Sequence, residues 1–169
     1  GFHIGTKQGD FNVRLGVSDT KTDGDNISRT GNERDGYENT SINLKAGFAI
    51  SEEFKLSFSA RQSDGMNEFD ADDDSDGFVE DQDRVSEFRN STIGLRADYV
   101  SVDGRWQHKL VIAQSKHDNE AFADGVLGNV TGSTKDQYQY IGSMFWDDSS
   151  QRISVLAERE EEDYKQRGP

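Results

Sequence analysis

Strict alternation of apolar and polar residues is the dominant pattern along the chain. Every second residue is apolar over seven positions in four stretches: 11–17, 42–48, 54–60 and 93–99. A period of two residues indicates a β-strand with one apolar face. Less regular versions of the pattern occupy three further stretches: 106–112, 138–146 and 153–157. The sequence therefore predicts about eight strands and no helix.

The connections between these strands alternate in length. Short turns are predicted at 8–10, 51–53, 103–104 and 147–150, and long polar connections at 20–37, 64–88 and 117–135. In an up-and-down meander every second connection lies at the same end of the sheet, so this alternation separates short turns from long loops. Outer-membrane barrels have that asymmetry. We therefore predict an all-β, antiparallel, up-and-down meander that forms a segment of a transmembrane β-barrel.

The aromatic residues support the same interpretation. Six of them lie within a few residues of a predicted short turn: Phe11, Phe48, Phe54, Tyr99, Trp106 and Trp146. Rings at one edge of the strands are typical of a membrane interface. The polar positions are rich in Ser, Gly, Lys and Arg, as in a wet barrel lumen. The alternative is a soluble sandwich that turns the same apolar faces inward, because alternation alone does not say which face is outside.

The composition limits the kinds of site and partner that the chain can have. The chain has 169 residues, no cysteine and a net charge of −14, and eleven acidic residues against one arginine fall within 64–87. The absence of cysteine removes disulfides and thiolate metal sites, and the negative charge argues against nucleic acid as a partner. The three histidines have no zinc-binding spacing, and no nucleophile or phosphate-binding motif is present. We predict no catalytic residues and no enzyme.

Three segments carry a resemblance to a known family. They are GNERDGYENTSINLKAGFAISEEFKLSFSARQSDGMNEFD, VDGRWQHKLVIAQSKHDNEAF and ISVLAEREEEDYKQRG. The first resembles the early barrel of TonB-dependent outer-membrane receptors, especially the cobalamin-receptor-like group, and the other two fit the same pattern. The resemblance covers most of the chain. Its motifs are a strand-turn-strand cadence with DGYEN-like loop ends.

The resemblance implies a bacterial outer-membrane barrel of about 22 strands that encloses a plug domain. Such a receptor imports a scarce nutrient, such as cobalamin or an iron chelate, with energy relayed through the plug by TonB. Residues 1–169 have no plug, no TonB-contacting box and too few strands, so we expect a barrel fragment. Its expected partners are outer-membrane lipid, the plug, the remaining strands and a small-molecule ligand. An open curved sheet is favoured over a small closed barrel.

The segment DDDSDGFVEDQD, residues 72–83, is similar to the calcium loop D-x-[DN]-x-[DN]-G. Alternate carboxylates on a tight turn converge on one hard cation, and glycine permits the turn. The predicted ligands are Asp72, Asp74 and Asp76, the carbonyl of Phe78, and Glu80 and Asp83. Asp83 stands where a bidentate glutamate is usual, and strands rather than helices flank the loop. The alternative is a solvated acidic loop without a metal.

Two further acidic groups have weaker interpretations. Asp19, Asp23 and Asp25 could contribute to a site shared with the next long loop. Glu158, Glu160 and Glu162 share one strand face, either as a ladder facing the lumen or as a strand end in water. A soluble, calcium-dependent, β-rich binding or adhesion module remains the alternative function for the whole chain.

Overall fold

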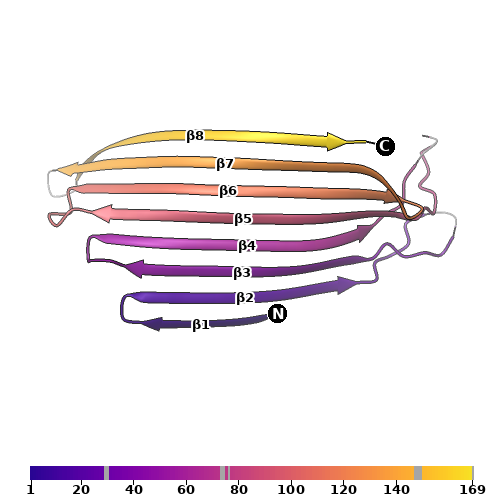
Figure 1. Ribbon diagram of the computed structural model, residues 1–169, viewed down its shortest axis with the longest axis horizontal. Helices are drawn as coiled ribbons and strands as arrows, with labels where there is room; N and C mark the ends of the chain where they lie inside the picture. Colours follow the sequence, from indigo (N-terminus) through magenta and orange to yellow (C-terminus); the bar gives the residue numbers. More distant parts are fainter. Residues whose placement is uncertain (29–30, 73–74, 76, 147–149, 169) are drawn as a thin grey trace.

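The computed structural model describes residues 1–28, 31–72, 75, 77–146 and 150–168. These residues form eight strands: β1 (Phe2–Gln8), β2 (Phe11–Thr22), β3 (Tyr37–Ala49), β4 (Phe54–Glu68), β5 (Arg84–Val100), β6 (Trp106–Ala123), β7 (Val126–Trp146) and β8 (Gln151–Arg167). Every strand pairs antiparallel with its neighbours in sequence, in the order β1 to β8 (Figure 1). The predicted open, antiparallel meander is confirmed.

Within the described ranges, no helix is long and apolar enough to cross a membrane.

The long connection predicted at 117–135 is wrong. Strands β6 and β7 continue to a two-residue turn at Asp124 and Gly125, whose φ angles are 52° and 70°. Positive φ at both central residues is the type I′ geometry that Asp-Gly favours in a hairpin. The paired residues on both faces of this hairpin are mostly polar, from His117↔Ser133 to Glu120↔Val130, so alternation disappears although the strands continue. Gly128 lies inside β7 beside a register shift.

The other two long connections are real but shorter than predicted. They span 23–36 between β2 and β3 and 69–83 between β4 and β5, at the same end of the sheet (Figure 1). Here too the strands continue as polar pairs, such as Asp19↔Thr40 and Asp64↔Arg89. We call this the long-loop end and the opposite end the short-turn end.

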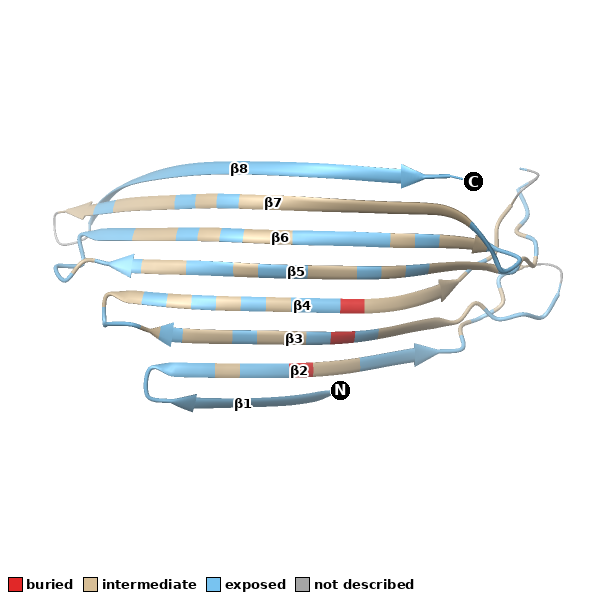
Figure 2. Ribbon diagram, viewed as in Figure 1, coloured by how far each residue is buried: buried red, intermediate tan, exposed pale blue. Residues whose placement is uncertain are grey.

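The sheet has no hydrophobic core. No hydrophobic residue is buried among those described, and the buried polar side chains are Ser41 and Ser63, whose hydroxyls lie 3.0 Å apart (Figure 2). The accessible surface is 11893 Å², against about 8300 Å² for a compact folded monomer of this mass. A sheet with an uncovered apolar face is not stable in water, so another layer must cover that face.

The registers place the alternating apolar residues on a single face. One row across the sheet runs Phe11↔Phe48, Phe48↔Leu56, Leu56↔Ala97 and Ala97↔Leu110. Residues directly opposite in an antiparallel pair point to the same side of the sheet. We call this side the apolar face and the other the polar face.

Candidate functional site

The apolar face carries a band that has the same length along five consecutive strands. On five consecutive strands the band is seven residues long, starting at the short-turn end with an aromatic residue: Phe11, Phe48, Phe54, Tyr99 and Trp106. It ends toward the long loops with an aliphatic residue: Val17, Ile42, Ala60, Ile93 and Ile112. On β7 the band runs from Trp146 to Tyr138. Seven residues of strand cover about 23 Å.

The band crosses the strands obliquely. The row that contains Val17, the last band residue of β2, passes through Ile42 and Thr134 and reaches Asp163 on β8. The last apolar residue of this face on β8 is Ala157, six residues short of Asp163. The edge of the band therefore shifts by one residue per strand over six steps. With a rise of about 3.3 Å and a strand spacing of about 4.8 Å, this shift corresponds to a tilt of about 35°.

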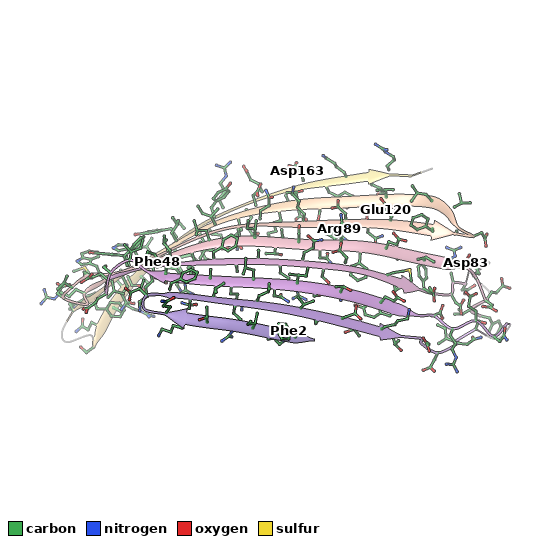
Figure 3. The ribbon with its side chains drawn as sticks, turned by 60° about the horizontal axis from the view of Figure 1, so that its bottom comes forward. Phe2, Phe48, Asp83, Arg89, Glu120 and Asp163 are labelled. Carbon is green, nitrogen blue, oxygen red and sulfur yellow. The ribbon has the colours of Figure 1, made fainter. Side chains whose placement is uncertain are left out.

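Stacked rings lie along the short-turn edge of the band. The label of Phe48 marks this edge in Figure 3. His108 stacks between Tyr99 and Tyr140, with ring centroids 5.9 Å apart in both pairs, and Trp106 lies 6.2 Å from His108. Nδ1 of His108 and the hydroxyl of Tyr140 share a 2.7 Å hydrogen bond. His108 therefore belongs to an aromatic row with polar atoms.

Charged and polar side chains begin directly beyond the opposite edge. Asp64 forms an ion pair with Arg89 and accepts a 2.7 Å hydrogen bond from Gln62, and Gln114 donates to Asp136 over 2.8 Å. Figure 3 shows Arg89 and Glu120 on this side of the band, toward Asp83. The apolar face is therefore divided into an apolar band and a wet zone near the long loops.

The two long loops meet through acidic residues. Six of them form what we call the acidic loop cluster: Glu33, Asp35, Glu68, Asp70, Asp81 and Asp83. A carboxylate oxygen of Glu68 accepts a 2.9 Å hydrogen bond from the backbone N–H of Gly36, which ties the first loop to β4. The side chain of Asp81 lies directly against Gly31 of the first loop. These contacts bring like charges together.

Two carboxylate atoms at this junction, Oδ2 of Asp35 and Oδ1 of Asp81, are buried and have no partner among the residues that the structure describes. Burial raises the pKa of Asp35, and the negative charges of Asp70, Glu68 and Asp81 raise it further. The pKa of Glu33 is raised by burial, Asp81 and Asp83 in the same way. The pKa of such a carboxyl is higher when the two loops pack together than when they are apart. Protonation of the carboxyl therefore stabilises the packed arrangement. We therefore expect the packing of the two loops to strengthen as pH falls toward about 4, where the same carboxyls would be protonated in separated loops as well.

The predicted calcium ligands lie in the second long loop, whose base is closed by a bridge between Ala71 and Glu80. Oδ2 of Asp72 accepts a 2.9 Å hydrogen bond from the N–H of Gly77, where φ is +88°. This contact produces the tight turn that the motif predicts at its glycine. Asp74 and Asp76 lie outside the described residues. Across the described ranges, no three acidic or histidine side chains are grouped so as to hold a metal ion.

Sequence reasoning missed most of the acidic loop cluster. It predicted a contribution from Asp19, Asp23 and Asp25, but the first loop meets the second through Glu33 and Asp35. Asp19 instead accepts a hydrogen bond from Thr40 within the sheet. The available signal was the high density of acids in the second long loop, at the same end of the meander as the first.

Glu158 and Glu160 of the last strand pair with side chains of β7. Both accept hydrogen bonds from Gln137, and Glu160 forms a 2.9 Å ion pair with Lys135. In register, Glu162 lies opposite Lys135. The three glutamates share the polar face, as their spacing predicted.

Comparison with known proteins gives no match to a family model, a curated protein or a solved structure. The fold and the sites described above therefore define a class only: an open antiparallel meander with one oblique apolar band.

Proposed function

We propose that this chain is a segment of a transmembrane β-barrel in the bacterial outer membrane. The observation that carries the proposal is the oblique apolar band, which is seven residues long on each strand from β2 to β6. Strands of such barrels tilt by about 35–45°, their apolar surface faces outward, and aromatic girdles mark the interfaces. A band that lies parallel to the membrane must then deviate by the same angle from the direction perpendicular to the strands. The shift of one residue per strand gives a deviation of about 35°.

The band's height also fits a thin membrane. A length of about 23 Å along strands tilted by about 35° projects to about 19 Å along the membrane normal. Outer-membrane barrels have apolar bands about 25 Å tall, and the bacterial outer membrane is thinner than average. The wet zone beyond the band then lies outside the hydrocarbon, together with the acidic loop cluster.

Within this class we propose a TonB-dependent receptor that imports a scarce nutrient, such as cobalamin or an iron chelate. The support is the family resemblance of the strand-turn-strand segments, together with short turns at one end and two long loops at the other. In this proposal the polar face lines the lumen and faces the plug domain. The long loops contribute to the outer surface that meets the ligand.

The membrane assignment is tested by the depth of the tryptophans. Trp106 and Trp146 are the two tryptophans of the chain, and both lie at the short-turn edge of the band. After reconstitution in vesicles, we expect phospholipids brominated near the headgroup to quench their fluorescence more strongly than lipids brominated near the acyl-chain ends. Single Trp→Phe variants resolve the two positions. Equal weak quenching by all brominated lipids would contradict the assignment.

We also propose that calcium binds the long loops. The support is the calcium-loop-like segment in which Asp72 accepts a hydrogen bond from Gly77. Further support comes from the two buried carboxylate atoms at the junction of the long loops that have no partner among the described residues. Carboxylate oxygens are the ligands that calcium prefers. A bound cation would offset the repulsion within the acidic loop cluster, as protonation does.

Hydrogen exchange tests the calcium proposal. We expect millimolar calcium at pH 7 to slow amide exchange in 31–36 and 69–83, whereas magnesium has a weaker effect. Lowering the pH toward 5 without calcium should slow the same amides, after correction for intrinsic exchange rates. The double variant Asp35→Asn/Asp81→Asn should lose much of the pH effect, whereas Asp10→Asn at a short turn should not. Exchange that responds to neither calcium nor pH would refute the proposal.

A further inference from the structure

Basic side chains are segregated on the polar face. From β1 to β6 this face carries eight lysines and arginines: Lys7, Arg14, Lys45, Lys55, Arg61, Arg84, Arg96 and Lys109. The same area holds one acidic residue, Asp98, which is paired with Arg96. The whole chain has 33 acidic and 19 basic residues. The polar face of β1 to β6 therefore has the opposite sign to the rest of the protein.

The arrangement of these cations is unfavourable in isolation. Arg14 and Lys45 lie directly opposite each other in the pairing of β2 with β3, and like charges in this position destabilise a sheet. Lys7 joins them around one hollow, whose floor includes Gly5 and Asn12. A negatively charged partner in this hollow would turn the repulsion into attraction.

Six of the cations have no ion pair among the described residues, and we call them the basic patch: Lys7, Arg14, Lys45, Lys55, Arg61 and Lys109. Elsewhere in the described sheet, acids neutralise cations, as in Lys21–Glu38, Arg89–Asp64 and Lys135–Glu160. Asp98 is the one acidic neighbour on this part of the described polar face: it lies opposite Lys55 and Lys109 in register and forms its ion pair with Arg96. The other polar positions around the patch are mostly serine, glycine and asparagine.

The patch surrounds a shallow floor. Gly47, Ser57 and Gly94 line a second hollow together with Lys45 and Arg96. Small side chains allow a partner's backbone to approach the sheet while long basic side chains surround it. Five strand spacings by six residues measure about 24 Å by 20 Å. This area is larger than the area that a small anion would cover, and it is comparable with part of a protein interface.

We propose that the polar face of β1 to β6 docks an acidic polypeptide segment. The positive patch steers such a segment and fixes its position through charge complementarity. Nucleic acid fits less well, because Glu158, Glu160 and Glu162 continue the same face on β8 and the chain has a net charge of −14. The inference depends on charges of the polar face and holds whether lipid or another layer covers the apolar face.

The test uses the full chain in a zwitterionic detergent and a fluorescein-labelled 20-residue poly-L-glutamate as the probe. We expect saturable binding by fluorescence anisotropy that weakens as salt rises. The double variant Arg14→Gln/Lys45→Gln should raise Kd about tenfold. The control Lys116→Gln/Lys165→Gln changes net charge equally on the apolar face and should change Kd less than about twofold.

Circular dichroism checks that each variant retains its strand content. If Arg14→Gln/Lys45→Gln does not fold, Lys55→Gln/Lys109→Gln probes the same patch and should weaken binding in the same direction. The proposal is overturned by absent binding, by equal losses in patch and control variants, or by tighter binding of a 20-residue oligothymidylate. It is also overturned if citrate competes as well as poly-L-glutamate at equal charge concentration. None of these results bears on the tryptophan depths, so the membrane proposal is judged separately.

Discussion

Replacing Leu56 by arginine is expected to lower the free energy of unfolding in lipid vesicles by about 2–4 kcal/mol. Leu56 is next to the middle of the band on β4, which is paired on both sides. At that depth the guanidinium must leave water or distort the bilayer. The measurement is a denaturant titration of the reconstituted chain, followed by tryptophan fluorescence.

Two variants on the same strand provide the controls. Ala60→Arg lies at the long-loop edge of the band and should cost about 0–1 kcal/mol, because the side chain reaches the interface. Ser57→Arg lies on the polar face and should cost less than about 1 kcal/mol. This dependence on depth is specific to a membrane. Equal losses for Leu56→Arg and Ala60→Arg would instead indicate a packed protein core.

Removing detergent is expected to precipitate the chain. The band covers about 34 Å across the strands and about 23 Å along them, or roughly 780 Å². Typical monomers expose apolar patches no larger than about 300–600 Å². The outer strands β1 and β8 each leave one edge unpaired, which promotes association further. Sedimentation after dilution below the critical micelle concentration measures the effect.

The matched control is the same chain transferred into lipid nanodiscs, which should stay monodisperse because lipid covers the band. A monodisperse monomer in plain buffer would contradict the membrane proposal. If calcium also raised the temperature of a cooperative thermal transition in that buffer, the soluble calcium-dependent binding module would be the better description.

The strands that cross the band were predictable because one of their faces is apolar and the other is polar. Where the residues of both faces are polar, the period of two residues disappears, and the β6–β7 hairpin was therefore predicted as a loop. Asp124-Gly125 was the correct local signal there, since both residues adopt positive φ. The approach of Glu33 and Asp35 to the second loop carries no sequence pattern, because it depends on how the two irregular loops fold over one another.

The sequence by itself determined the parts of the strands that cross the band, their antiparallel order and which of their side chains share a face, since these follow from local alternation and short turns. Only the tertiary structure decided the registers between strands. Those registers align seven-residue apolar segments into an oblique band, gather unpaired cations on the polar face and bring acids from two loops together. The physical reason is that alternation fixes the face of each residue within its own strand, whereas the offset between strands depends on pairing along their whole length.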